Sequence, residues 1–494
     1  MHRNPEEVRV AVIGGGITGL SAAYYSCKMY REAGYSPKIT LIEASQRLGG
    51  KIDTLRRDGF VIERGPDSFL ARKTAIMELT DELGLGQELV ATDPRNKKTY
   101  ILHGGKLRRI PPGLVLGVPT QWKPFLSTAL LSPFGKLRAA LDLALPAAKG
   151  DEDESLGGFL RRRLGSEVVD WVAEPLLSGI YAGNADKLSL LATFPQFREA
   201  ERKYGSLIVG LSRGAGHSRD GADPASASFQ IPQHVRGSVF LSYARGLSAL
   251  TEALERALRR EGVALRLGVS VRAIRRALGE TVLAMDEGDP LGADVVIAAL
   301  PPPHLSALLP ELPEAAEFAD MEYASVANVV LAYDKKDVSA PLDGTGFVIP
   351  RKEGRFITAC TWTSSKWSHT APDSHVLIRC YVGRSDDERW SGMNDETLKE
   401  AVGKEVEELA GISAKPLFVD INRLNRSMPQ YSVGHLEKIR SLREALSRRI
   451  PGVYATGAGF EGVGLPDCIR QAKEAVRQSL SFIASESADE TSRS

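Results

Sequence analysis

The stretch that decides the fold is residues 8–51, VRVAVIGGGITGLSAAYYSCKMYREAGYSPKITLIEASQRLGGK. An apolar run over 8–13 predicts a β-strand, and the glycine motif over 14–19 predicts a tight turn into a helix. A second apolar run follows and ends at Glu43. This order of strand, glycine-rich turn, helix, strand and acid is the fingerprint of a βαβ unit that binds a dinucleotide.

Each glycine of the motif has a separate expected task. Gly14 allows the tight turn, Gly16 lets the backbone approach a pyrophosphate, and Gly19 lets the helix pack closely on the strand. The helix N-terminus offers free N–H groups to the phosphates, and Glu43 stands where a carboxylate accepts hydrogen bonds from ribose hydroxyls. Glycine motifs also occur in ordinary strand-to-helix turns, but the complete pattern favours cofactor binding.

The residues after Glu43 indicate which dinucleotide is bound. Residues 47–51, RLGGK, place a second glycine pair just beyond the ribose-binding acid. Such a pair is more typical of FAD proteins than of NAD proteins, because the chain there passes close to the diphosphate and ribityl of FAD. The sequence therefore predicts FAD as the cofactor.

The loop over 63–69, ERGPDSF, is a second candidate contact with the cofactor. Gly65 and Pro66 fix a turn. Asp67 and Ser68 have two interpretations: they cap the next helix, or they belong to a loop lying under the isoalloxazine ring.

A third glycine-rich segment lies near the C-terminus. Residues 456–468, TGAGFEGVGLPDC, end where a long helix is predicted to begin. Glycines at that place suit a phosphate or the edge of a flavin, because they admit a flat ring to close backbone contact. The alternative is an ordinary strand-to-helix turn, which the N-terminal fingerprint makes the weaker interpretation.

Composition excludes several classes of protein. The 494 residues suffice for two or three domains, and the net charge of +1 gives no sign of nucleic-acid binding. The four cysteines lack CxxC spacing and the eight histidines lack HxxH spacing, so we expect neither a disulfide framework nor a metal site. No secretory signal precedes the first strand and no apolar run is long enough to span a membrane, so we expect a cytoplasmic protein.

The order of predicted elements gives an α/β fold with three parts: a Rossmann-like FAD-binding domain that is discontinuous in sequence, an inserted β-sheet substrate domain and a helical cap domain. The expected FAD-binding domain comprises residues 1–95, 201–310 and 426–484, with a flexible polar segment at 201–235 and a disordered tail at 485–494. The expected substrate domain comprises the hairpin 96–110 and the β-rich residues 311–425, and the expected cap comprises residues 111–200.

Residues 111–149 differ in composition from the rest of the chain. They are apolar, interrupted by prolines, and carry the basic Lys136 and Arg138. We expect a helical cover over a ligand pocket. The alternative is a surface that makes weak peripheral contact with a membrane or with a partner.

No set of side chains typical of nucleophilic or acid–base catalysis is convincing in this sequence. Flavin chemistry needs none, because the cofactor accepts hydride while the protein supplies orientation and electrostatics. We therefore nominate no catalytic residue and no metal ligand.

The motifs together resemble those of a known family. The chain resembles the flavin-dependent porphyrinogen oxidases of haem synthesis, within the monoamine-oxidase-like FAD superfamily, over nearly its whole length. The final helix is preceded by a segment that replaces the aromatic cage of amine oxidases. The most specific segments are ERGPDSF (63–69), EPLLSGIYAGNADKLSLLATFP (174–195), RGLSAL (245–250), MPQYSVGH (428–435) and GVGLPDCI (462–469).

This resemblance implies an oxidase that uses FAD, a porphyrinogen substrate and O₂. In the Gram-positive branch, which ERGPDSF and the extended first helix resemble, coproporphyrinogen III is oxidised to coproporphyrin III. Related branches use protoporphyrinogen IX. The resemblance also allows a transient contact with the next enzyme of the haem pathway.

The resemblance carries over a set of cofactor-binding residues, in which Leu424 stands where relatives often have Trp. FAD would be bound non-covalently by Gly14, Gly15, Gly16, Ile17, Thr18, Gly19, Glu43, Ala44, Lys51, Gly65, Pro66, Asp67, Ser68, Val271, Leu424, Gly462, Val463 and Gly464.

The resemblance also places the substrate over the flavin. Ala182 and Gly183 of the YAGNAD turn and Trp362 would lie near it, and His103 stands where relatives hold a cationic side chain for a propionate. The other cations on the same predicted hairpin that would serve instead are Lys98, Lys106 and Arg108.

Two other classes of function compete with this interpretation. One is another flavin enzyme of the superfamily, an amine oxidase or a carotenoid desaturase, but the GVGLPDC and YAGNAD segments argue against both. The other is a non-catalytic escort protein on the same fold, which the intact glycine motif and Glu43 argue against.

Overall fold

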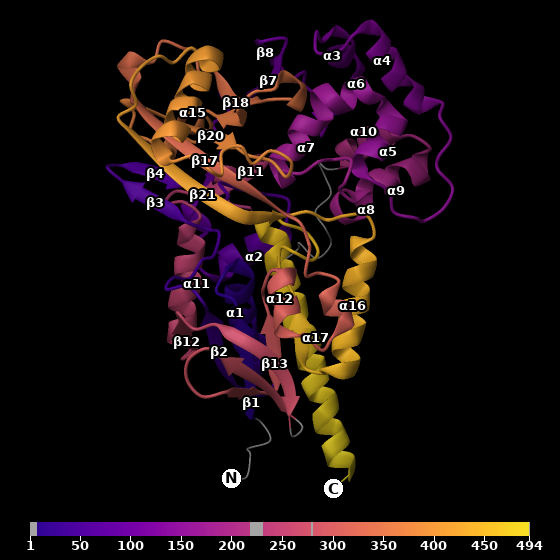
Figure 1. The fold of residues 1–494 in the computed structure, drawn as a ribbon, viewed down its shortest axis with the longest axis vertical. Coiled ribbons are helices and arrows are strands. Elements are labelled where there is room, and N and C mark those ends of the chain that lie inside the picture. The colour runs from indigo at the N-terminus through magenta and orange to yellow at the C-terminus, as the bar shows by residue number, and fades with distance from the viewer. Residues whose placement is uncertain (1–6, 218–230, 278–279, 494) are drawn as a thin grey trace.

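A computed structural model describes residues 7–217, 231–277 and 280–493 of the chain (Figure 1). Its lower half in Figure 1 is a parallel sheet covered on both faces, and its upper half holds a second sheet beside a group of helices. Both ends of the described chain lie at the bottom of the lower half. The two halves therefore present loops to one another across the middle of the molecule.

The lower half is built on a five-stranded parallel sheet whose strands come from the beginning, middle and end of the sequence. This arrangement confirms the predicted Rossmann-like domain that is discontinuous in sequence. In spatial order the strands are β12 (Ala264–Leu267), β2 (Ser36–Glu43), β1 (Glu7–Ile13), β16 (Val295–Ala298) and β22 (Val453–Ala455).

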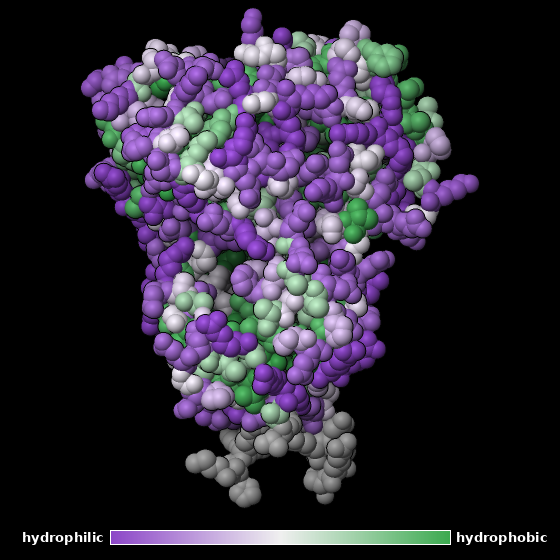
Figure 2. All heavy atoms as spheres, in the orientation of Figure 1, coloured by the Kyte–Doolittle hydropathy of each residue, from purple (hydrophilic) through white to green (hydrophobic). Residues whose placement is uncertain are grey.

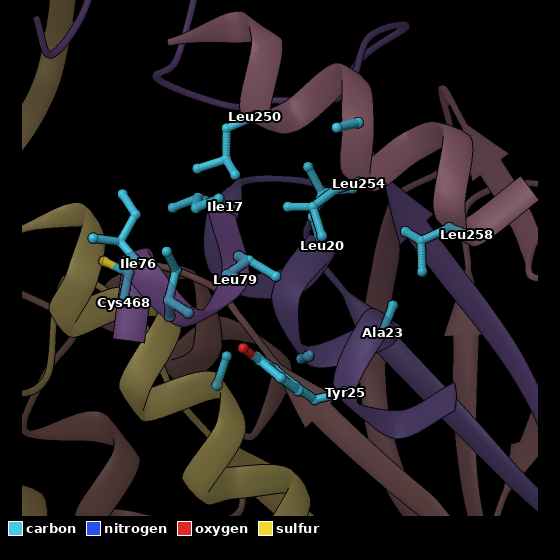
Figure 3. Packing of buried hydrophobic residues seen from close by; sticks show 14 of the residues in the cluster. Ile17, Leu20, Ala23, Tyr25, Ile76, Leu79, Leu250, Leu254, Leu258 and Cys468 are labelled. Carbon is cyan, nitrogen blue, oxygen red and sulfur yellow. The ribbon is translucent and has the colours of Figure 1, made fainter. Parts of the chain in front are cut away.

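Alternate side chains of β1 pack into two different cores, as expected for a parallel strand buried on both faces. Val8, Val10 and Val12 face one core, whereas Ala11 and Ile13 face the other. Figure 3 shows the first core from close by, where buried side chains of four helices pack together. Those helices are α1 (Ile17–Glu32), α2 (Thr74–Glu82), α11 (Ser248–Arg260) and α17 (Leu465–Arg493).

The second core lies between the parallel sheet and a small antiparallel sheet with three helices. The strands are β13 (Val271–Ala277), β14 (Glu280–Met285) and β15 (Leu291–Ala293), and the helices are α12 (Pro302–Leu308), α13 (Pro313–Ala316) and α16 (His435–Arg449).

A seven-stranded sheet forms one side of the upper half. Its outer two strands are the predicted hairpin around Gly104 and Gly105, which joins strands that lie hundreds of residues later in the chain. The order is β21 (Phe418–Pro429), β17 (Tyr323–Asp334), β20 (His375–Val382), β19 (Ile357–Thr361), β18 (Gly344–Val348), β7 (Lys98–His103) and β8 (Lys106–Arg109).

One face of this sheet is covered by α15 (Asp395–Ala410), which buries Leu398, Val402 and Val406. The helix begins where the Asn394 side chain accepts a hydrogen bond from the Thr397 N–H, a standard N-cap. The remaining small elements link the two halves: β3 (Thr54–Arg57), β4 (Phe60–Glu63), β5 (Phe69–Leu70), η1 (Gly86–Glu88), β6 (Leu89–Ala91), η5 (Gln233–Val235), β11 (Phe240–Tyr243), η6 (Lys335–Asp337), η7 (Arg351–Glu353), α14 (Thr363–Lys366) and η8 (Ser368–Thr370).

The other side of the upper half is helical and has its own apolar core. Beneath this core lies a buried ion network in which Arg163 contacts both Asp142 and Glu201. The elements are β9 (Leu114–Val115), β10 (Val118–Pro119), α3 (Trp122–Ser127), α4 (Pro133–Ala140), η2 (Leu141–Leu143), α5 (Leu156–Leu164), α6 (Ser166–Val168), η3 (Val169–Ala173), α7 (Glu174–Tyr181), α8 (Leu190–Thr193), α9 (Pro195–Tyr204) and α10 (Leu207–His217).

Two sequence-based expectations about irregular segments were wrong. The polar segment at 201–235 is helical through α9 and α10 up to His217, because Leu207 and Ile208 bury apolar side chains in the cap core; residues 218–230 lie outside the described part. The tail expected to be disordered from 485 continues α17 as far as Arg493. Its Ser and Glu residues carry no apolar pattern, so periodicity gave no signal there.

Among the helices of the described residues, none is long and apolar enough to cross a membrane.

Candidate functional site

The three glycines of the motif after β1, Gly14, Gly16 and Gly19, differ in whether the fold requires them. Gly14 has φ +103°, and a Cβ on Gly19 would lie 1.8 Å from the Gly14 carbonyl oxygen. A Cβ on Gly16 would meet nothing closer than the Gly50 Cα at 4.0 Å. The fold therefore explains Gly14 and Gly19, whereas Gly16 borders open space at the N-terminus of α1.

Glu43 ends β2 beside this turn. Its carboxylate accepts hydrogen bonds from the N–H of Gly15 at 2.6 Å and from the N–H of Ser45 at 2.8 Å. Its carbonyl accepts from the N–H of Val269, which brings the segment leading to Val271 alongside. Ala44 is exposed. The acid and the turn thus lie together, and Val269, two residues before Val271, is beside them.

Lys51 is brought beside the turn by the bridge between Gly16 and Gly49, and it borders the open space at Gly16, which we call the recess. Its side chain reaches open space, yet the protein packed around it lowers the pKa of its ammonium by burial. The ammonium donates to the Ser427 carbonyl and lies 5.8 Å from the centre of the Tyr323 ring. No carboxylate of the described residues lies within ion-pair distance of it. An unpaired cation in such a place favours an anionic ligand.

The loop Gly65–Ser68 is held by the seven-stranded sheet rather than by a helix. Arg379 of β20 donates to the carbonyls of Glu63 and Gly65 at 3.0 and 3.3 Å. The amides of Asn328 and Asn422, paired across β17 and β21, both donate to the Arg64 carbonyl. Three side chains from the sheet, of which Arg379 and Asn328 are buried, therefore fix the backbone that precedes Pro66.

Asp67 is the charged centre of this loop. Burial alone would raise the pKa of its carboxyl, but Lys366 and Arg379, both within 3.3 Å, hold that pKa well below its usual range. Ser68 donates to the same carboxylate, and α2 begins only at Thr74 with no side-chain cap. The interpretation of Asp67 and Ser68 as a helix cap was therefore wrong.

Glu63 lies just before the same loop. Burial raises the pKa of its carboxyl to about 7, although the N–H of Leu247 and the hydroxyl of Thr54 both donate to it.

The loop over 456–464 approaches the glycine turn from the C-terminal side. Gly457, with φ +129°, would place a Cβ only 3.6 Å from the Thr18 hydroxyl, so the two loops are neighbours. The Thr456 hydroxyl is buried and has no hydrogen-bond partner. Val463 packs partly against the core of the helical cap. This loop therefore joins the lower half to the cap.

Leu424 lies in β21 opposite Val326 and is half-buried. Three residues later the same strand supplies the Ser427 carbonyl that Lys51 contacts. The structure thus brings Leu424 to the part of the sheet that borders the Lys51 recess.

The YAGNAD turn ends α7 and meets the MPQY segment. Ala182 adopts a left-handed conformation with φ +50°, which is unusual for a residue with a side chain and marks a strained position. A Cβ on Gly183 would lie 2.2 Å from the Gln430 side-chain oxygen. Arg351 donates to the Gly183 carbonyl. Two motifs that are distant in sequence therefore form one contact.

The cations of the β7–β8 hairpin do not form one cluster, contrary to the expectation. His103 pairs with Lys106, and Ile101, which enters the cap core, pairs with Arg108, so these side chains share the face toward the cap. Lys98 faces the other side, where it forms an ion pair with Asp343 at 2.5 Å. Side chains alternate along a strand, and the sequence argument did not apply that rule here.

His103 itself contacts the cap through Trp171, with ring centres 4.5 Å apart. Trp362 is a core residue: its ring packs against Tyr100 and Phe347 and is almost fully buried. Neither contact was visible in the sequence.

Taken together, the recess has the features that a dinucleotide requires. It combines free N–H groups at a helix N-terminus, open space at Gly16, a ribose-type acid at Glu43 and the unpaired Lys51 ammonium. These donors fit the anionic diphosphate of FAD, and the orphaned Thr456 hydroxyl is a further free polar group beside it. In the described part of the chain, no group of three His, Cys, Asp or Glu side chains is placed to hold a metal ion.

The fold and the recess define an FAD-binding flavoprotein of the Rossmann-like class. More narrowly, the chain belongs to the family described as "Flavin containing amine oxidoreductase", whose sequence profile matches residues 17–480. The protein is therefore an oxidoreductase with FAD as its cofactor, as predicted.

Individual relatives match almost the whole chain. A Bacillus subtilis protein named coproporphyrinogen III oxidase is 44% identical and aligns over 96% of this chain and 98% of its own length. The human protein named protoporphyrinogen oxidase is 31% identical, over 94% of this chain and 97% of its own length. A crystal structure from Exiguobacterium sp. 255-15, described as a candidate protoporphyrinogen oxidase, has a TM-score of 0.82 at 39% identity, covering 96% of this chain and 98% of that chain.

Several residues around the recess were missed by the sequence analysis. Arg379 and Lys366 gave no signal because isolated cations in strands and loops are common on protein surfaces. Gln430 and Tyr431 stood in a motif that was quoted for its resemblance alone. The Thr456 hydroxyl was missed because only the structure shows that it is buried and has no hydrogen-bond partner.

Proposed function

We propose that this protein oxidises coproporphyrinogen III to coproporphyrin III with O₂ in haem synthesis, and that protoporphyrinogen IX is a second substrate. The observation that carries the proposal is the contact between the YAGNAD turn and the MPQY segment beside the FAD recess. Relatives named coproporphyrinogen III oxidase, 44% and 40% identical, support the same reaction.

The overall reaction removes six hydrogens from the macrocycle and forms three H₂O₂ from three O₂. When bound, FAD accepts hydride from carbon and passes the electrons to O₂. Three hydrogens leave the bridging carbons as hydride. Two pyrrole N–H groups and one further bridging C–H, which tautomerises to nitrogen, supply the three accompanying protons, so the protein needs no dedicated base. The task of this chain's own residues is to bind, to orient and to exclude water.

We assign the recess residues named from the sequence to the FAD, with the loops at Gly65–Ser68 and Gly462–Gly464 facing the flavin. Ala182 and Gly183 would face the substrate. Trp362 would support the substrate site indirectly, by packing beneath the surface of the sheet, because its ring lies in the core. We do not assign a propionate to Lys98, since Asp343 already neutralises it.

Anaerobic mixing with coproporphyrinogen III is expected to bleach the flavin absorption of the holoprotein, because substrate hydride reduces the FAD. Air should then restore the yellow colour and generate porphyrin fluorescence. Holoprotein that stays yellow with both porphyrinogens would contradict the proposal. A protein purified without flavin would favour the escort-protein alternative, and bleaching by amines would favour an amine oxidase.

Substrate choice is expected to depend on the hairpin face toward the cap. Coproporphyrinogen carries two more carboxylates than protoporphyrinogen, and burying an unpaired carboxylate is costly. Replacing Lys106 and Arg108 together by Ala should raise KM for coproporphyrinogen roughly fivefold more than KM for protoporphyrinogen, the value of one partly exposed ion pair.

Lys98→Ala is the matched control for this experiment. Lys98 lies on the same hairpin but faces Asp343 on the opposite side. We expect it to leave the ratio of the two KM values unchanged. Equal effects of the double variant on both substrates would leave this face without a role in selection.

The cap surface over α3 and α4 is our candidate for weak peripheral contact with a membrane. Figure 2 shows hydrophobic residues gathered at the upper right, where Figure 1 places these helices. Phe134 is 77% exposed and Leu137 63% exposed. The Arg138 side chain does not add to this surface, because its guanidinium donates to backbone carbonyls of α5. The next residue, Ala139, is fully buried. The same surface would also suit a transient contact with the next haem-pathway enzyme.

Replacing Phe134 and Leu137 by Ser is expected to reduce sedimentation with phosphatidylglycerol vesicles more than about tenfold, since two large apolar side chains lose their burial. Leu417→Ser, at a residue that is 55% exposed beside the seven-stranded sheet, serves as the control. Wild-type protein that does not sediment with vesicles would remove the membrane from the proposal.

We also propose that the protein works in the cytoplasm. All four cysteines are buried free thiols, and Cys360 and Cys380 lie opposite each other on neighbouring strands. Thiol titration of the protein from its native cells is expected to find all four reduced. A bond between Cys360 and Cys380 would point to an oxidising compartment instead.

A further inference from the structure

One dipeptide contacts both of the loops that border the proposed ligands. Gln430 and Tyr431 follow β21 and precede α16, and both are buried. Gln430 reaches the turn after α7, whereas Tyr431 reaches the loop over 456–464. Neither residue touches the glycine turn or belongs to the predicted site.

Gln430 holds the turn that contains Ala182 and Gly183. Its side-chain N–H groups donate to the carbonyl of Tyr181 at 2.8 Å and to that of Met428 at 3.0 Å. Its side-chain oxygen lies against Gly183 so closely that a Cβ there would be 2.2 Å away. The amide therefore fixes the backbone on which α7 ends.

Tyr431 holds the loop expected at the edge of the flavin. Its hydroxyl donates to the Ala458 carbonyl at 2.5 Å and accepts from the Gly462 N–H at 3.1 Å. Its ring stacks on His435 with centres 4.4 Å apart. Burial raises the pKa of this hydroxyl well above its usual value, so the hydroxyl remains a donor at every physiological pH.

The backbone of the dipeptide is itself fixed on both sides. The Gln430 N–H donates to the Glu322 carbonyl at 3.0 Å, and the Tyr431 carbonyl accepts from the Ser189 N–H at 2.7 Å. Gln430 and Tyr431 are adjacent, so their Cα atoms stay about 3.8 Å apart. The two loops that they hold therefore cannot move relative to each other unless a buried hydrogen bond breaks.

We propose that Gln430 and Tyr431 are positioning residues that keep the substrate turn at Ala182 and Gly183 in register with the flavin-edge loop over 458–462. The identity of the two ligands rests on the proposed function. Hydride transfer requires donor and acceptor atoms in near-contact, and small misplacements are costly. The dipeptide would set that separation through the protein rather than by touching either ligand.

Tyr431→Phe tests the flavin side of the proposal, since it removes only the hydroxyl. The Ala458 carbonyl and the Gly462 N–H would lose their shared partner. We expect the Kd for FAD, measured by titrating apoprotein and following flavin fluorescence, to rise roughly tenfold, the worth of one buried hydrogen bond. The visible circular dichroism of the bound flavin should also change.

Tyr30→Phe is the matched control. The Tyr30 hydroxyl is equally buried and donates to Ser479 Oγ at 2.9 Å, near the far end of α1. Both variants should lower Tm by similar amounts, but only Tyr431→Phe should change FAD affinity and the flavin spectrum. Equal FAD affinity and equal spectra in the two variants would overturn the proposal.

Gln430→Met tests the substrate side while keeping the side-chain volume. It should raise KM for coproporphyrinogen III roughly fivefold, with the Kd for FAD unchanged. Unchanged KM and kcat in Gln430→Met, or a loss of FAD affinity equal to that of Tyr431→Phe, would overturn the substrate side of the proposal. A wild-type holoprotein that oxidises no porphyrinogen would contradict the proposed function, whereas the FAD titrations of Tyr431→Phe would still decide the positioning role.

Discussion

Gly16→Val is expected to give a folded protein that has lost its FAD. A Cβ at this position meets nothing within 4.0 Å except the Gly50 Cα at that distance, so the fold itself tolerates a side chain. The space that the side chain enters is the approach to the helix N-terminus, where a pyrophosphate must come close to the backbone. We expect FAD affinity to fall more than about a hundredfold, the loss of ~3 kcal/mol of charge-assisted contacts.

The measurement is FAD content after purification together with circular dichroism of the same sample. Native helical signal with no flavin is the expected result. Gly19→Val is the contrasting variant, because its Cβ would lie 1.8 Å from the Gly14 carbonyl oxygen and should prevent folding altogether. Normal flavin content in folded Gly16→Val would place the cofactor elsewhere.

These glycines illustrate what local sequence can predict. The strand, glycine turn, helix and second strand ending at Glu43 depend on spacing and propensity over a few residues, and the structure confirms this order of elements. The discontinuous parallel sheet was also predictable, since short apolar runs such as residues 295–298 mark buried strands.

Pairings between distant residues could not be predicted in the same way. The hairpin at 96–110 was expected, but only its register shows that Lys98 faces Asp343 while Arg108 faces the cap. The resemblance placed Trp362 near the substrate, but the ring of this residue, which follows β19, is packed in the core. In both cases the missing information was the neighbour across the sheet.

The helical cap shows a second limit. Residues 201–217 look polar because their first residues, Glu201, Arg202 and Lys203, carry charge. Glu201 is nevertheless fully buried, where it pairs with Arg163 and Arg198. When the ion-pair partners of a charged segment are unknown, its sequence predicts that the segment is exposed to solvent. Its apolar residues Leu207 and Ile208 were too few to indicate a buried helix by periodicity alone.

Arg379→Met is expected to destabilise the protein by about 3–5 kcal/mol, the usual cost of breaking a buried ion pair from one side. The guanidinium is 5% exposed and serves Asp67, the Tyr381 hydroxyl and the carbonyls of Glu63 and Gly65. Methionine fills similar space but supplies no donor. Chemical denaturation at neutral pH measures the loss, and the loop Gly65–Ser68 should become the most exchange-labile part of the site.

Arg389→Met is the control, because that arginine is 58% exposed and pairs with Asp387 at the surface. This substitution should lower the free energy of unfolding by less than about 1 kcal/mol. A similar loss in both variants would mean that Arg379 contributes no more than a surface ion pair.

The pH dependence separates the charge effect from the lost hydrogen bonds. In the wild type, burial opposes ionisation of Asp67, but Lys366 and Arg379 lower its pKa below the unfolded value, so its stabilising contribution exists above that value and is lost as pH falls. Without Arg379 the folded pKa rises, and ionised Asp67 becomes a smaller gain or a penalty at neutral pH. The stability gap between the two proteins should therefore be widest at neutral pH and narrow as pH falls through about 4, the ordinary carboxyl range. A gap that stays constant from neutral to acidic pH would assign the whole effect of Arg379 to its backbone hydrogen bonds and none to Asp67.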